Sequence, residues 1–185
     1  GKDAMISNLD PEENFGKHPY FEATWMTDDS QLTVMRENRS LIQFRPAGLP
    51  KSAIIEKVVL RLAYHIPIPW EDKDSIYLDV NGDLLCAGVL QQIVEPWEEH
   101  EVTWAKQPKT NEKVQVVIHP FIKNANFIDV DVTRMFVNEF SWPSYRMLFK
   151  LTPQPCFPGF RFASSDFDVP EMRPMLTIYY TLPIY

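Results

Sequence analysis

Long apolar runs, cysteine frameworks and glycine-rich loops are all missing from this chain of 185 residues. No stretch approaches the roughly 18 consecutive apolar residues that a membrane-spanning helix requires, which excludes such a helix. The two cysteines, Cys86 and Cys156, are too few for a disulfide framework, so two buried thiols and one disulfide between them both stay open. The six glycines are isolated from one another, which excludes a glycine-rich phosphate loop.

Positive charge is also in deficit. The chain carries 18 Lys and Arg against 25 Asp and Glu, a formal net charge of −7, and no basic stripe is present. An acidic domain repels phosphate backbones, so we expect no nucleic-acid partner. The chain begins with Gly1 rather than Met, and we expect that a signal segment has been removed. A membrane would then be reached only through a lost lipid anchor.

Aromatic residues and proline are plentiful instead. The sequence has 12 Phe, 7 Tyr and 5 Trp, and 45% of its residues are hydrophobic, which excludes a disordered chain. Its 16 prolines are well above the usual share of about 5% of residues. Because proline breaks helix interiors and cannot donate to a sheet ladder, this number predicts many turns and strand ends.

Short apolar segments that end at turn residues predict β-strands throughout the chain. The clearest has Val58, Leu60, Leu62 and Tyr64 at alternate positions, which places them on one face, expected to be the core face. Asn81-Gly82 between two apolar runs predicts a tight hairpin. The other predicted strands are residues 4–7, 21–26, 31–36, 40–45, 75–80, 83–90, 114–119, 146–151, 160–164 and 175–181.

A single short helix is predicted near residue 135. Asp131 or Thr133 can cap it, Met135 and Phe136 follow at helical spacing, and Pro143 ends it. Strands greatly outnumber helices, so the sequence predicts an all-β fold, an antiparallel β-sandwich with one short helix. No linker divides the chain, and residues 1–185 are expected to form one domain.

No catalytic motif emerges from the sequence. The histidines lack the i, i+4 spacing of a metalloprotease helix, and no Gly-x-Ser-x-Gly elbow is present. Four carboxylates, Glu95, Glu98, Glu99 and Glu101, crowd around His100 and can suggest a glycosidase-like site. Solvated turn residues between two strands explain them better, so we expect a protein that is not an enzyme.

Two pairs of aspartates are weak candidates for a structural calcium site, because hard cations prefer oxygen ligands. Asp129 and Asp131 alternate at the end of a strand, and Asp166 and Asp168 share a loop. Helix capping explains Asp131 equally well, and solvation explains the others. No other cofactor is expected.

Aromatic residues are the remaining signal, because exposed rings can stack on the flat C–H faces of sugars. The candidates are Trp25, Trp70, Trp142, Tyr20 and Tyr145. For any single ring, packing in the core is the better explanation. Trp70 is the most notable, because residues 67–74 are predicted to form a loop, where a ring is less easily buried.

An ordered series of motifs spans nearly the whole chain: Asp3-Ala4-Met5-Ile6, Asn14-Phe15-Gly16, residues 39–44, Leu49-Pro50, residues 59–62, residues 129–135 and Arg173-Pro174. Its most specific part is Trp97-Glu98, then Val102-Thr103-Trp104, then Gln107-Pro108. Together these motifs resemble the DNRLRE domain family, bacterial extracellular modules related to the carbohydrate-binding modules found beside alginate lyases. The resemblance implies a jelly-roll-like sandwich, secreted or surface-attached, in which Trp97 and Trp104 are structural.

The chain departs from the family in residues 153–159, which are proline-rich, and at Ser165, where the family often carries Arg before Glu. Its acidity also argues against an alginate-like ligand, although a local basic patch around Lys57, Arg61 and His65 stays open as a binding site. The leading hypothesis is a non-catalytic bacterial module, extracellular or at the cell surface, that binds a polysaccharide or neighbouring domains of its parent protein. The alternatives are a structural or adhesive spacer and a carbohydrate-active enzyme.

Overall fold

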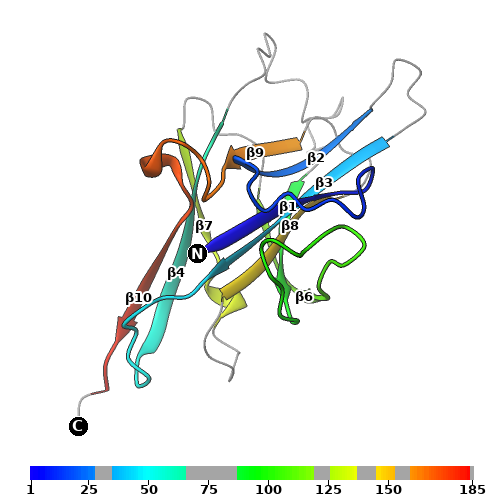
Figure 1. The fold of residues 1–185 in the computed structure, drawn as a ribbon. Helices are drawn as coiled ribbons and strands as arrows, with labels where there is room; N and C mark the ends of the chain where they lie inside the picture. The colour runs from blue at the N-terminus through cyan, green and yellow to red at the C-terminus, as the bar shows by residue number, and fades with distance from the viewer. Residues whose placement is uncertain (28–34, 66–86, 119–125, 137–144, 153–158, 184–185) are drawn as a thin grey trace, which may run out of the picture.

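The computed structural model describes residues 1–27, 35–65, 87–118, 126–136, 145–152 and 159–183. Within these ranges nearly all of the regular secondary structure is β-strand, which confirms the predicted all-β class (Figure 1). The strands are β1 (Lys2–Ser7), β2 (Tyr20–Thr27), β3 (Met35–Phe44), β4 (Ile54–Ala63), β5 (Ala87–Ile93), β6 (Thr110–Ile118), β7 (Phe127–Asp131), β8 (Tyr145–Thr152), β9 (Gly159–Ala163) and β10 (Met175–Thr181). Two single-turn 3-10 helices complete the described elements, η1 (Thr133–Met135) and η2 (Pro170–Met172).

The strands form two sheets, and all neighbouring strands within each sheet pair antiparallel. The larger sheet has seven strands in the order β6-β5-β8-β3-β2-β9, with β1 added through β3. The smaller sheet has the order β10-β4-β7. The two sheets pack face to face as a β-sandwich (Figure 1).

The main apolar core lies between the two sheets. Val58, Leu60 and Leu62 of β4 are fully buried in it, which confirms the core face predicted from their alternation. The larger sheet contributes Phe21, Phe149 and other side chains to the same core, and these two rings stack 5.4 Å apart. Burial of each such side chain stabilises the folded state by about 1.5–3 kcal/mol relative to exposure. The sum of these contributions holds the two sheets together.

A second apolar cluster covers the opposite face of the larger sheet. Leu41 and Leu148 belong to it, whereas Ile42 of β3 and Met147 of β8 belong to the main core, and adjacent residues of a strand point to opposite faces. Trp97, from the segment between β5 and β6, is buried in this second cluster. The larger sheet is therefore covered on both faces.

Two secondary-structure predictions need correction. Residues 37–39 were expected to separate two strands, but β3 runs without a break from Met35 to Phe44. Glu37 and Asn38 are buried there, and the Asn38 amide donates to Glu22. The predicted helix is the single 3-10 turn η1, where Asp131 accepts hydrogen bonds from the backbone and hydroxyl of Thr133.

Several predictions fall on residues that the structure does not describe. These include the Asn81-Gly82 hairpin, both cysteines and the end of the predicted helix at Pro143. Within the described ranges, no helix has the length and apolar character needed to cross a membrane.

Candidate functional site

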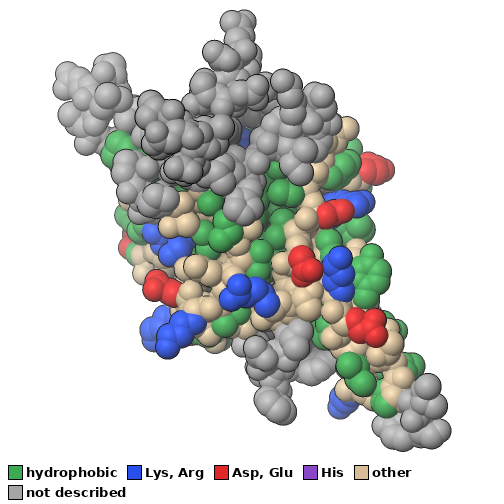
Figure 2. Space-filling view, turned by 180° about the vertical axis from the view of Figure 1, so that it is seen from behind, with side chains coloured by type: hydrophobic (Ala, Val, Ile, Leu, Met, Phe, Trp, Pro, Cys, Tyr) green, Lys and Arg blue, Asp and Glu red, His purple; other side chains and the backbone are tan. Residues whose placement is uncertain are grey.

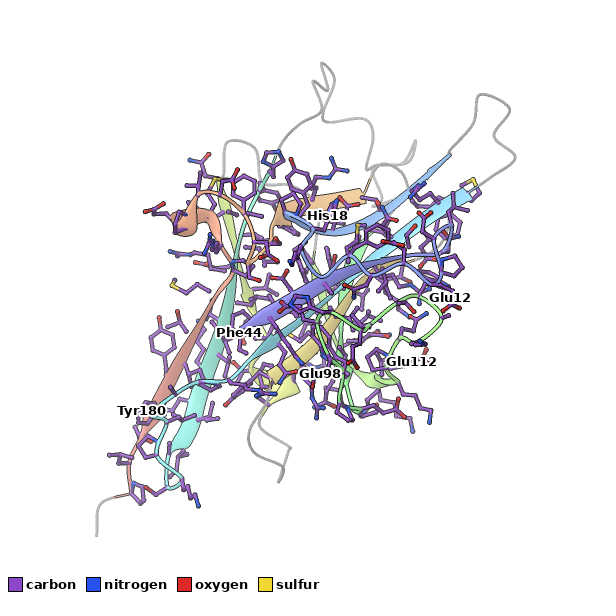
Figure 3. The ribbon with its side chains drawn as sticks, in the orientation of Figure 1. Glu12, His18, Phe44, Glu98, Glu112 and Tyr180 are labelled. Carbon is purple, nitrogen blue, oxygen red and sulfur yellow. The ribbon has the colours of Figure 1, made fainter. Side chains whose placement is uncertain are left out.

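The candidate site is a group of five aromatic side chains from three separate parts of the chain. Phe15 and His18 precede β2 and Tyr20 is its first residue, His65 lies two residues after the end of β4, and Phe167 lies in the turn after β9. We call this group the ring cluster. Figure 3 shows His18 beside the strands β2 and β9.

Strand pairing explains how these distant segments meet. β2 pairs with β9 from Tyr20 onward, and an isolated bridge between Tyr64 and Phe162 joins the end of β4 to β9. The backbone N–H of His65 then donates to the carbonyl of Arg161 at 3.1 Å. The ring cluster therefore forms where β2, β4 and β9 come together.

The five rings are in continuous contact. Tyr20 and His65 stack with their centroids 4.6 Å apart and their planes at 27°. Phe167 meets His65 edge-on at 5.2 Å, His18 meets Tyr20 at 5.5 Å, and Phe15 meets His18 at 6.5 Å. All five side chains are half-buried, so each one packs against its neighbours and still contacts solvent.

A fixed cation borders the ring cluster. The guanidinium carbon of Arg161 lies 5.1 Å from the centroid of the Tyr20 ring, a cation–π distance. Its Nε donates to Glu22 at 2.6 Å, and the amide of Asn38 donates to the other oxygen of that carboxylate at 2.8 Å. Because the Glu22 side chain is only 2% exposed, its carboxylate holds the guanidinium in one position beside the rings.

The electrostatics of the cluster favour a neutral His65. Burial lowers the pKa of its imidazole below the ordinary value of 6.5, and the nearby charge of Arg161 lowers this pKa further. This shift favours the uncharged form of the His65 imidazole. Apolar rings with a single guanidinium suit a ligand that has flat C–H faces together with hydroxyl or carboxylate groups.

The other aromatic candidates lie elsewhere. Tyr145 is buried against Phe136 at 4.2 Å, and burial raises the pKa of its hydroxyl. Trp25 is half-buried and packs against the main core. Trp70 and Trp142 lie outside the described residues.

The three residues of the candidate basic patch have different surroundings. Arg61 donates from Nε and Nη2 to the two carboxylate oxygens of Asp129, at 2.7 Å each. The hydrogen bonds from Thr133 are the main cause that lowers the pKa of Asp131, and the charge of Lys57 adds to this shift. His65 belongs to the ring cluster, about 27 Å from Lys57 at the usual rise of an extended strand. Figure 2 accordingly shows basic and acidic side chains next to one another on this side of the molecule.

Two of the four acidic candidates already have partners in the fold. Both oxygens of Asp129 are occupied by Arg61, and Asp131 accepts from Thr133. Asp166 and Asp168 lie in the exposed turn after β9. Among the described residues, no three His, Cys, Asp or Glu side chains gather as a group that could hold a metal ion.

The crowded glutamates shape the segment between β5 and β6. Glu95 accepts from the backbone of Lys109 at 2.9 Å, Glu98 pairs with Lys2 at 3.1 Å, and Glu99 accepts from the backbone of Asp3 at 2.9 Å. Three of the four glutamates therefore make contacts within the fold.

The buried carboxyl of Asp3 is a feature that sequence reasoning missed. Its Oδ2 accepts from the backbone N–H of Ser165 at 2.7 Å and so ties β1 to the turn after β9. Burial is the main cause that raises the pKa of Asp3 to about 6, and the nearby Asp166 and Glu99 add to the shift. The sequence pattern of β1 cannot reveal that this carboxyl is buried, because the turn that covers it lies 162 residues away in the chain.

No model of a known protein family matches the chain, and no curated protein matches it either.

Proposed function

We propose that the protein is a non-catalytic extracellular module that binds a polysaccharide at the ring cluster. The observation that carries the proposal is the gathering of five half-buried rings beside the fixed guanidinium of Arg161. Sugars combine apolar C–H faces with dense hydroxyls, and such a surface offers a partner to both. The rings come from three segments joined by strand pairing and by the Tyr64–Phe162 bridge, so we expect little ordering entropy to oppose binding.

Two further observations support this proposal. The ordered motifs that resemble the DNRLRE family imply a jelly-roll-like sandwich, a bacterial surface location and a role beside polysaccharide-active proteins. The carboxylates most suggestive of a glycosidase make structural contacts instead, which favours binding over hydrolysis.

Binding to insoluble polysaccharides and to an array of neutral and acidic glycans tests the proposal. The informative variants are Phe167→Ala and His65→Ala, which remove half-exposed rings and leave Arg161 and Glu22 in place. Loss of one stacking ring should weaken binding about tenfold. The matched control is Phe127→Ala, which removes an exposed ring of β7 outside the ring cluster and should leave affinity unchanged.

Two results would contradict the proposal: no binding to any glycan, or equal binding by all three variants. Turnover of a glycan during long incubation would instead favour a carbohydrate-active enzyme.

The second candidate function is a structural or adhesive spacer, and one specific observation favours it. Several large apolar side chains of β4 and β10 are exposed to solvent, as an interaction between protein domains would require.

A further inference from the structure

The end of the smaller sheet that carries β10 projects from the body of the sandwich. Figure 1 shows β4 and β10 extending together beyond the larger sheet, and Figure 3 shows Tyr180 on this projecting part. Among the described strands, β10 pairs only with β4, so it is an edge strand. The backbone N–H and C=O groups along its other edge have no strand partner within the described ranges.

Exposed apolar side chains concentrate on these two strands and just beyond β10. They are Ile54, Met175, Tyr179, Tyr180 and Leu182, with exposures from 41% to 57%. Tyr179 and Tyr180 are consecutive, and consecutive residues of a strand point to opposite faces. Both faces of the two-stranded ribbon formed by β4 and β10 therefore present apolar surface to solvent, and Figure 2 shows apolar side chains at this projecting end.

β10 also lacks the features that normally prevent edge strands from pairing. Natural edges carry charges, prolines or bulges, whereas Met175–Thr181 contains neither a charge nor a proline. A bulge does occur beside Tyr179 and Tyr180, but the extra residue is Glu56 on β4, so β10 itself stays regular. Only one other described strand, β5, is free of charge, and it lies inside the larger sheet between β6 and β8.

We propose that β10 is a self-association edge at which two copies of this chain pair antiparallel about a two-fold axis. The two smaller sheets would join into one continuous sheet of six strands, three from each copy. The occupant is a second copy because a neutral strand brings no like charges together when it meets itself, although each domain carries a net charge of −7. A strand without charge also offers nothing to select a charged partner.

The geometry suits this isologous contact. The ribbon projects, so two copies can approach edge to edge without collision of their larger sheets (Figure 1). The Tyr179 and Tyr180 rings of each copy can then pack across the new strand pair, as aromatic residues do across antiparallel strands. Thr177 and Tyr179 lie on the outer face of β10, because Leu176 and Ile178 pack against the core.

Sedimentation equilibrium or light scattering over a concentration series tests the proposal on the full chain. The wild-type protein should form dimers. One variant carries Thr177→Lys with Tyr179→Lys, and another carries Thr177→Glu with Tyr179→Glu. Each should dimerise at least tenfold more weakly, because the two-fold axis brings the charged positions of both copies onto the same face of the joined sheet, where like charges repel. An equimolar mixture of the two should dimerise again, since opposite charges then meet.

The matched control is Val94→Lys, which adds a charge at a position as exposed as Met175, at 48%, but outside the ribbon. It should dimerise like the wild type. Far-ultraviolet circular dichroism and thermal unfolding establish that every variant is folded. A monomeric wild type at the highest concentration would overturn the proposal. Association that survives both double variants, or a mixture that stays monomeric, would overturn it as well.

Discussion

Arg161 and Glu22 lie 139 residues apart in the chain, yet the guanidinium Nε donates to the buried carboxylate at 2.6 Å. This contact joins β9 to β2 beneath the ring cluster. We expect Arg161→Met to lower the free energy of unfolding by about 2–3 kcal/mol, because it leaves a buried carboxylate without its cation. Urea denaturation measures the loss. Adding Glu22→Gln to the same protein should recover at least half of it.

Arg61 supplies the matched control for this prediction. Its ion pair with Asp129 has similar distances, but both side chains are nearly half exposed. Solvent screens such pairs, so Arg61→Met should cause no measurable change in stability. Equal losses from the two substitutions would show that burial of Glu22 is not what gives the Arg161 pair its strength.

Asp3 predicts an unusual dependence of stability on pH. Its pKa rises from 3.8 in the unfolded chain to about 6 in the folded protein. The folded state therefore binds the proton more tightly, and the contribution of Asp3 to stability falls as the pH rises from about 4 through 6. We expect Asp3→Asn, which keeps an acceptor for Ser165, to gain about 3 kcal/mol relative to wild type between about pH 4 and pH 7.

Denaturation at a series of pH values measures this relative gain. Asp129→Asn is the control, because its partner Arg61 lowers the pKa of Asp129. The stability that this lowered pKa confers is lost only as the pH falls below the ordinary range of aspartate. The difference between Asp129→Asn and wild type should therefore stay constant between about pH 5 and pH 7. A flat difference for Asp3→Asn would contradict the prediction.

Substitution of two glycines with positive φ can distinguish the stability cost of backbone strain from the cost of steric contact. Gly159 has φ 108°, and a Cβ placed there would lie 2.6 Å from the carbonyl oxygen of Ala23. Gly48 has φ 80°, and its Cβ would meet no atom within 4 Å. We expect Gly48→Ala to cost about 1 kcal/mol and Gly159→Ala about 3 kcal/mol. Thermal unfolding of the two variants measures both losses of stability. Equal losses would show that the steric contact with Ala23 of β2 adds nothing to the cost of backbone strain.

Calcium is not expected to stabilise the described part of the fold. The carboxylate oxygens of Asp129 are both engaged by Arg61, and Asp131 accepts from Thr133. A bound ion that is absent from the unfolded chain raises the melting temperature with its concentration. We therefore expect the same Tm, within about 1 °C, in excess calcium and in excess chelator. A calcium-dependent rise would require other oxygen ligands.

The strands of the core could be predicted because burial on one face leaves an alternating pattern. β4 shows this most clearly, since Val58, Leu60 and Leu62 all enter the core. β3 could not be predicted as a single strand, because Glu37 and Asn38 have the composition of a turn. Their burial depends on partners such as Asn8 and Glu22, which lie on other parts of the chain.

The candidate site was predictable only in fragments. Tyr20 could be named as an aromatic candidate and His65 as a basic one, but nothing in the sequence places them together. Their contact depends on the pairing of β2 with β9 and on the bridge between Tyr64 and Phe162. Phe167 and Arg161 carry no local signal, because a ring after a strand and an arginine within one are ordinary features.

The two apolar clusters on either face of the larger sheet have a consequence for native-state motion. β3 and β8 lie inside that sheet, and Leu41 and Leu148 point to one cluster while Ile42 and Met147 point to the other. Their amides can reach solvent only when both clusters open together. Hydrogen–deuterium exchange at β3 and β8 should therefore be the slowest in the domain and should report global unfolding, whereas the amides of β10 in the monomer should exchange through local fraying.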